Sequence, residues 1–216
     1  MRRRKNVDRE SIRVTAMMKG NRTLILASAS PRRRELLGQM GLEFLVVPSG
    51  ADENVAETDP EKKVELLAER KAEEVFERLR RERPEISPVV IGSDTLVAID
   101  GEILGKPADR EEAIAMIALL QGKTHEVSTG VSIFWEEDGQ VCRDTFCSTT
   151  HVEVYPMTAE DIAAYVDTGE PYDKAGGYGI QGRFCVWVKG ICGDYDTVVG
   201  LPAAALYQRM RKLGLL

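Results

Sequence analysis

Hydrophobic side chains recur at helical spacing over one long segment of the chain, residues 60–83. The apolar positions there are three or four residues apart, which places them on one face of an α-helix. They are Val64, Leu67, Ala68, Ala72, Val75, Phe76 and Leu79. The pattern therefore predicts a long amphipathic helix that packs this face against a core.

Capping residues predict further, shorter helices. Ser, Thr or Asp precedes three of them and Gly follows, and these residue types satisfy the free backbone groups at helix ends. The last helix starts at a proline, which suits a first helical position. The predicted helices cover residues 30–41, 109–122, 158–169 and the chain from 202 onward.

Short apolar runs between these helices predict strands. Asp100-Gly101 and Glu137-Asp138-Gly139 are typical of hairpin turns, and the strand at 89–91 is expected to end in residues 92–95. The predicted strands are 24–27, 44–47, 89–91, 96–99, 102–104, 126–135, 140–155, 184–188 and 195–199. We therefore expect an α/β fold in which a mixed, twisted sheet is flanked by helices and carries inserted hairpins.

The regular pattern begins near Thr23, so we expect a single domain over residues 22–216. Residues 1–21 are basic and lack periodicity, which predicts a disordered extension; a short anion-binding arm is the alternative. This segment has no apolar core, so it does not resemble a signal peptide. No apolar run approaches the ~20 residues that span a bilayer, so no membrane partner is expected.

Composition bears mainly on the class of ligand. The net charge is -6, whereas a general nucleic-acid binder is usually basic, so no nucleic-acid partner is expected. A small anionic ligand is still compatible with this charge, because a local cluster of cations is enough to bind it. The four cysteines include no Cys-x-x-Cys pair, so we expect no zinc site.

The first candidate for chemistry is the segment Ser28-Ala29-Ser30-Pro31-Arg32-Arg33-Arg34. A helix N-terminus already carries partial positive charge and free amides, so three arginines in its first turn repel the dipole. A bound polyanion would compensate, because amides and guanidiniums can converge on phosphate. The segment predicts a phosphate cradle, with a solvated basic turn as the alternative.

The second candidate is Gly92-Ser93-Asp94-Thr95, directly after an apolar run. Small residues let a ligand approach the backbone, and an aspartate at a strand end can hold a metal or orient water. The alternative for Asp94 is a turn aspartate that hydrogen-bonds its own backbone.

Three further charged residues, Glu53, Lys71 and Lys106, lie near these segments. Lys71 stands among apolar positions of the predicted long helix, where an ammonium needs a partner or must reach out to solvent. Ordinary surface charge is the alternative for each of the three.

The fourth candidate is the glycine-rich segment Asp173-Lys174-Ala175-Gly176-Gly177-Tyr178-Gly179-Ile180-Gln181-Gly182. The amide of Gln181 carries one acceptor and two donors, which suits the edge of a base. A plain flexible loop is the alternative. A phosphate cradle, a carboxylate pair, lysines and an amide together describe a nucleotide site.

These segments, in this order, resemble the Maf family of nucleoside triphosphate pyrophosphatases over nearly all of residues 22–216. The most specific matches are Leu26-Ala27-Ser28-Ala29-Ser30-Pro31-Arg32-Arg33, Gly92-Ser93-Asp94-Thr95, Gly105-Lys106-Pro107, the segment 173–182, and Val199-Gly200-Leu201-Pro202. Thr95 and the run Tyr178–Gly182 are similar to the dTTP/UTP branch. Phe184 departs from the family by its bulk, which bears on the shape of the pocket.

The resemblance implies a metal-dependent hydrolase of acid anhydrides that splits a nucleoside triphosphate into a monophosphate and pyrophosphate. It implies that Asp94 is the catalytic base and that Glu53, with Asp94, holds Mg²⁺ or Mn²⁺. The sequence leaves open whether Asp94 acts as a tight ligand or as a free base. The residues matching substrate-binding positions are Ser28, Arg32, Arg33, Lys71, Thr95, Lys106 and Gln181.

The resemblance also implies a cytoplasmic protein, often a homodimer, linked to cell-division arrest and to clearing modified nucleotides from the pool. Two alternatives stay open. One is a pyrophosphatase for methylated guanosine triphosphate, against which Thr95 and Gln181 argue. The other is a non-catalytic nucleotide-binding regulator of septum formation, which would not need both Glu53 and Asp94.

Overall fold

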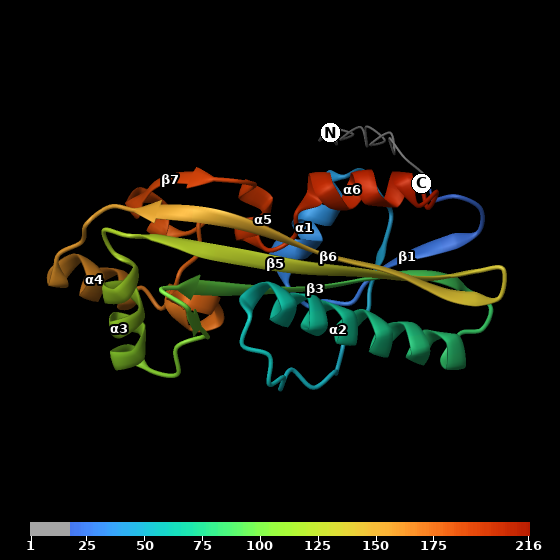
Figure 1. Ribbon diagram of the computed structural model, residues 1–216, viewed down its shortest axis with the longest axis horizontal. Helices are drawn as coiled ribbons and strands as arrows, with labels where there is room; N and C mark the ends of the chain where they lie inside the picture. Colours follow the sequence, from blue (N-terminus) through green and yellow to red (C-terminus); the bar gives the residue numbers. More distant parts are fainter. Residues whose placement is uncertain (1–17) are drawn as a thin grey trace, which may run out of the picture.

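The computed structural model describes residues 18–216, in which helices surround one central sheet (Figure 1). The predicted extension falls mostly on residues 1–17, outside the described residues. Residues 18–21 belong to the fold, because the Lys19 backbone N–H donates to the Leu215 carbonyl oxygen at 3.0 Å. Met18 packs against the core beside the C-terminal residues.

The helices lie where periodicity and capping residues predict them, with one addition. Thr158 and Asp161 form a reciprocal capping box at the fourth helix, and Asp109 accepts from the Glu112 backbone N–H at the third. The fifth helix, α5, was not predicted. The helices are α1 (Pro31–Gln39), α2 (Pro60–Glu82), α3 (Arg110–Leu120), α4 (Ala159–Val166), α5 (Tyr195–Val199) and α6 (Ala203–Lys212).

Seven strands form one mixed sheet in the order β2-β1-β3-β5-β6-β7, with β4 paired to β3. The β2–β1 and β1–β3 pairs are parallel and the others are antiparallel. The predicted fold class is therefore confirmed. The strands are β1 (Arg22–Leu26), β2 (Leu45–Val46), β3 (Ser87–Ile99), β4 (Glu102–Leu104), β5 (Thr124–Glu137), β6 (Gln140–Val154) and β7 (Val188–Cys192).

Two of the antiparallel connections are tight hairpins. The central residues Asp100-Gly101 and Asp138-Gly139 all have positive φ, between 51° and 84°. This conformation matches the twist of paired strands, and it favours a glycine at the second position. Both predicted hairpin turns are confirmed.

The helices cover the sheet in separate groups (Figure 1). α2 packs on one face, where its apolar stripe meets β1 and β3. α1 and α6 lie on the opposite face, and α3 and α4 pack together at the far end of the sheet. No helix within residues 18–216 combines the length and apolar character needed to cross a bilayer.

The strand predicted to end before Gly92 instead continues to Ile99 as β3. The small residue there serves a close crossing and not a turn, because a Cβ at Gly92 would overlap the Ala68 carbonyl oxygen of α2. Asp94 is therefore a mid-strand residue, and the prediction of a strand end at residues 92–95 was wrong. Its carboxylate bonds a lysine of α2 rather than its own backbone.

Two strand predictions near the C-terminus were also wrong. Residues Arg183–Trp187 form a 3-10 helix, because the Phe184 ring turns inward against Tyr165 and Tyr178. Residues Tyr195–Val199 form α5, which the Asp194 side chain caps. The β-favouring composition of this segment is overridden by the cap and by tertiary packing.

Candidate active site

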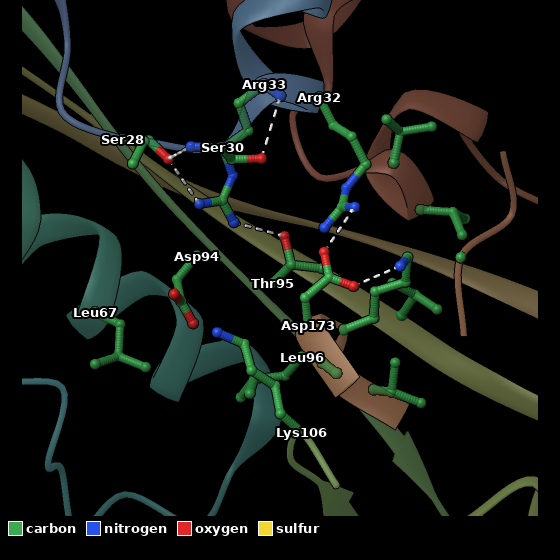
Figure 2. Close-up of a pocket in the computed structure, with 18 of the residues that line it drawn as sticks. Ser28, Ser30, Arg32, Arg33, Leu67, Asp94, Thr95, Leu96, Lys106 and Asp173 are labelled. Atoms are coloured by element: carbon green, nitrogen blue, oxygen red, sulfur yellow. Dashed lines mark hydrogen bonds and ion pairs between the residues drawn. The ribbon is translucent and has the colours of Figure 1, made fainter. Parts of the chain in front are cut away.

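All nine predicted site residues line one cleft of about 1130 Å³. They are Ser28, Arg32, Arg33, Glu53, Lys71, Asp94, Thr95, Lys106 and Gln181. The side of the cleft formed by residues 27–33, α2 and β3 is called the framework wall here. The side formed by residues 170–182 is called the loop wall. Figure 2 shows the side chains of both walls pointing into the space between them.

The cleft lies where β1 ends and β3 continues. The two strands pair in parallel as far as Leu26 and Ile91, after which the chain leaves the sheet toward α1. The part of β3 beyond Ile91 is therefore not covered by β1. Ligands of open α/β sheets bind in such places, outside the carboxyl ends of strands.

Lys71 of the framework wall joins two acidic residues, Asp94 of β3 and Glu53 of the segment between β2 and α2. Its Nζ atom lies 2.7 Å from Glu53 Oε1 and 2.6 Å from Asp94 Oδ1, and its side chain is only 12% exposed. The hydrogen bond from Lys71 lowers the pKa of Glu53; partial burial opposes this shift, and the charges of Lys71 and Lys106 support it. Lys71 stands among apolar residues and was therefore expected to need a charged partner. The carboxylates of Glu53 and Asp94 are that partner.

Arg33 turns inward from α1 and bonds three different segments. Its guanidinium donates to the Gly200 carbonyl oxygen at 2.8 Å, to Thr95 Oγ1 at 3.0 Å and to Ser28 Oγ at 3.3 Å. Burial lowers the pKa of Arg33, and the nearby Asp94 carboxylate opposes that shift. A guanidinium has five N–H groups, so two remain for a ligand.

Asp94 and Thr95 are neighbours in sequence but serve opposite faces of the sheet, because successive strand side chains alternate. Asp94 faces α2 and bonds Lys71. Thr95 faces the other way, where its hydroxyl lies 3.0 Å from Arg33 Nη2 and 2.9 Å from Thr129 Oγ1. The strand thus holds an acid in one half of the cleft and fixes an arginine in the other.

The start of α1 supplies a helix N-terminus beside these cations. Ser30 caps the helix, and Pro31 occupies its first position. The first turn contains no acidic residue. Protein acceptors compensate part of the positive charge, since Arg32 lies 3.5 Å from Asp173 and Arg33 bonds Thr95 and Gly200. The free amides and the remaining guanidinium donors suit an anionic ligand.

The loop wall consists of two short 3-10 turns, η1 (Glu170–Asp173) and η2 (Ala175–Gly177), followed by a turn at residues 180–182. Gly176 and Gly177 have φ of 68° and 70°, which other residues rarely adopt. Gln181 is exposed and lines the cleft. Phe184, whose bulk was expected to bear on the shape of the pocket, is fully buried behind the loop wall and does not line the cleft.

Asp173 was not singled out as a site residue, although its segment was. Its carboxylate contacts Arg32 and Lys174 across the mouth of the cleft (Figure 2). Burial raises the pKa of Asp173, but the hydrogen bond and charge of Lys174, together with Arg32, more than offset this and leave it lowered. Only the folded chain shows that Asp173 faces an arginine 141 residues away.

A divalent cation fits the pair Glu53 and Asp94 when a substrate supplies further ligands. Carboxylate oxygens are preferred ligands of Mg²⁺ and Mn²⁺, and both carboxylates already converge on one positive charge, the Lys71 ammonium. Among residues 18–216, no group of three or more His, Cys, Asp or Glu side chains could hold a metal ion. Mg²⁺ commonly binds through one or two carboxylates together with substrate phosphates.

Comparison with known proteins agrees with this geometry. The family described as "Maf-like protein" matches residues 23–213. A protein of Agathobacter rectalis named dTTP/UTP pyrophosphatase is 48% identical over 88% of this chain and 97% of its own length. Proteins with the same name from Lachnoclostridium phytofermentans and Thermococcus onnurineus are 45% and 46% identical, over 89% and 88% of this chain and 95% and 97% of their own lengths. The chain belongs to the Maf-like protein family.

Proposed function

We propose that this chain is a nucleoside triphosphate pyrophosphatase that converts dTTP and UTP, or modified pyrimidine nucleotides, to the monophosphate and pyrophosphate. The observation that carries the proposal is the convergence of several cations with Glu53 and Asp94 in one cleft, in a chain whose relatives are named dTTP/UTP pyrophosphatases. The cations that the proposal uses are Arg32, Arg33, Lys71 and Lys106. They match the charge of a triphosphate, and the carboxylates match the need for a base.

The phosphates bind against the framework wall in this proposal. Arg32 and Arg33 offer guanidinium donors, Ser28 offers a hydroxyl, and the start of α1 offers free amides. Lys106 extends into the cleft toward the Asp94 carboxylate (Figure 2). Together these groups stabilise the negative charge that builds on the phosphates in the transition state.

Asp94 acts as the general base. It accepts a proton from water, whose oxygen bonds to the α-phosphorus while the bond to the bridging oxygen breaks and pyrophosphate leaves. Lys71 orients the Asp94 carboxylate through its 2.6 Å hydrogen bond.

Glu53 and Asp94 would hold a divalent cation, Mg²⁺ or Mn²⁺, together with phosphate oxygens. When bound, such an ion neutralises phosphate charge and polarises the phosphoryl group. Lys71 sits between the same two carboxylates, so it also limits their mutual repulsion before the substrate binds.

Gln181 reads the base from the loop wall. Its exposed amide can match the donor and acceptor pattern on the edge of thymine or uracil. Thr95 contributes indirectly, because its hydroxyl is engaged by Arg33 and Thr129 and so fixes the arginine nearest to it.

A panel of nucleoside triphosphates tests the proposal. Purified protein is incubated with Mg²⁺ or Mn²⁺, and monophosphate and pyrophosphate are measured beside an Asp94→Asn control. Release from dTTP and UTP, absent in the control, supports the proposal. Release only from methylated guanosine triphosphate would reassign the substrate, and nucleotide binding without turnover would favour a regulator of septum formation.

We propose in addition that the protein works in the cytoplasm as a homodimer and contributes to nucleotide-pool clearance and cell-division arrest, on the basis of the family. Size-exclusion chromatography with light scattering tests the dimer. A monomer at all concentrations would remove that part of the proposal without affecting the catalytic one.

A further inference from the structure

A buried histidine lies behind the loop wall, outside the cleft itself. His125 stands near the start of β5 and is 2% exposed. Its Nε2 atom lies 2.7 Å from the Tyr178 hydroxyl, and the two rings meet edge to face. Its other nitrogen, Nδ1, is buried and has no hydrogen-bond partner within residues 18–216.

The unpartnered Nδ1 atom gives no reason for a histidine at this position. A buried polar atom without a partner costs free energy that an apolar side chain of similar size would avoid. Burial also lowers the pKa of His125 to about 4, so the imidazole is neutral near pH 7. The property that an apolar residue could not supply is the hydrogen bond to Tyr178.

Tyr178 connects this bond to the cleft. It is 5% exposed, lines the cleft, and stands three residues before Gln181 in the loop wall. Its ring also packs on Phe184, at 4.6 Å between centroids. Between residues 176 and 180, the chain has two glycines with positive φ, so its own backbone preferences hold it weakly.

A second tyrosine, Tyr165, also holds this segment. The Tyr165 hydroxyl donates to the Gly177 carbonyl oxygen at 3.3 Å, and its ring lies 5.0 Å from Phe184. The Tyr165 bond acts on the backbone, whereas the His125 bond acts on the Tyr178 side chain. Removing the His125 bond should therefore loosen the residues after Tyr178 without unfolding the loop.

We propose that His125 is a positioning residue for base recognition, which holds Tyr178 by its hydroxyl and thereby fixes Gln181 at the cleft. The inference rests on the proposed role of Gln181 as the reader of the base. It assigns His125 no contact with the substrate and no role at the phosphates.

Three variants test this proposal. Tyr178→Phe removes the hydroxyl and keeps the ring packing. His125→Leu removes both ring nitrogens. The double variant replaces the bonded pair by apolar groups, which can restore stability because no polar partner is left buried. His151→Gln is the matched control, since His151 is exposed on β6 and bonds neither tyrosine.

The readouts separate base recognition from phosphate chemistry. We measure kcat and KM for dTTP, for dCTP and for inorganic tripolyphosphate, which has no base, together with the midpoint of thermal unfolding. We expect Tyr178→Phe to lower the ratio of kcat/KM for dTTP over dCTP by roughly fivefold or more, the effect of about one hydrogen bond. Tripolyphosphate hydrolysis should stay near the wild-type rate.

The double variant separates positioning from mere packing. If its unfolding midpoint returns to the wild-type value while the preference for dTTP stays reduced, the positioning role is supported. If the preference returns together with the stability, the pair only fills space and the proposal fails.

A parallel Gln181→Ala variant distinguishes the proposed role of His125 from the proposed function of the protein. Loss of preference in Gln181→Ala but not in Tyr178→Phe would overturn the role of His125 and leave the proposed function intact. An unchanged preference in Gln181→Ala would overturn the roles of both Gln181 and His125 in base recognition and leave the pyrophosphatase activity standing. No turnover of dTTP by the wild-type protein would overturn the proposed function as well.

Discussion

The framework wall and the loop wall place their side chains by different means. The framework wall uses regular elements: Asp94 is mid-strand in β3, Lys71 is in the middle of α2, and Arg33 is in the first turn of α1. The loop wall has no long helix or strand, and two of its glycines, Gly176 and Gly177, adopt positive φ. Buried aromatic side chains, Tyr165, Tyr178 and Phe184, hold it from behind.

The difference bears on what each wall can do. Backbone hydrogen bonds of regular elements hold the framework wall, which suits groups that must be placed accurately against a reacting phosphorus. A loop held by a few side chains can change its shape more cheaply, which suits recognition of the variable part of a substrate. Changes to the framework wall should therefore affect the rate, and changes to the loop wall should affect the choice of base.

The largest effect is expected at the framework wall, for Asp94→Asn. An amide cannot accept the proton from water, so kcat should fall by roughly 10²–10⁴-fold, the usual contribution of a general base. Pyrophosphate release under saturating dTTP measures this change. The unfolding midpoint should stay close to wild type, and a variant that keeps more than a tenth of the wild-type kcat would rule out Asp94 as the base.

The next effect concerns His125, which holds Tyr178 of the loop wall, and the dependence of the protein's stability on pH. Burial lowers the pKa of His125 to about 4, below the ~6.5 of an unfolded chain, so the unfolded state binds the proton first as pH falls. The contribution of neutral, buried His125 to the free energy of unfolding is complete above about pH 6.5 and is lost as pH falls toward 4. This contribution amounts to ~3 kcal/mol in total.

Urea unfolding at several pH values between 7 and 4.5 tests this window. The wild-type protein and His151→Gln should lose stability in parallel, whereas His125→Leu should lose less over the same range. Identical slopes for wild type and His125→Leu would show that His125 does not stay neutral in the folded protein.

A third prediction concerns the crossing of α2 over β3 in the framework wall. Gly92→Ala adds a Cβ that overlaps the Ala68 carbonyl oxygen and the Ala72 backbone nitrogen. Relieving the overlap must move α2 away from β3, at a cost of about 1–3 kcal/mol in the free energy of unfolding. Because Lys71 lies between those two residues, the distance from Lys71 to Asp94 should grow, and kcat should fall.

Gly190→Ala is the matched control for that change, because Gly190 is also in a strand and nothing lies within 4 Å of its added Cβ. Denaturant unfolding and kcat are measured for both variants. Equal changes of kcat and of the free energy of unfolding in the two variants would contradict the close crossing at Gly92.

The smallest effect is expected at the loop wall, for Gln181→Ala. The variant loses the amide that reads the base and keeps every phosphate ligand, so kcat/KM for dTTP should fall by roughly tenfold. The rate with tripolyphosphate should stay the same. An equal loss with both substrates would mean that Gln181 acts on the phosphates, and the contrast between the two walls would then fail.

Local features of the sequence determined most of the helices and both hairpins. Capping residues and the 3.6-residue repeat act within a few positions, so Thr158 with Asp161, or Asp138 with Gly139, carries its own structural information. The motifs also brought out nine of the residues that line the cleft. Residue types that suit phosphate, metal and base can be recognised before their positions in space are known.

Only the tertiary structure decided how these residues meet. Glu53 and Asp94 share Lys71 because α2 crosses β3 closely at Gly92, and the sequence pattern around Gly92 predicted a strand end instead. Residues Tyr195–Val199 have the composition of a strand but form a helix, because Asp194 caps it and Thr197 and Val199 are buried by distant elements. The contacts of Asp173 with Arg32 and of His125 with Tyr178 join segments far apart in the chain, so no local pattern contains them.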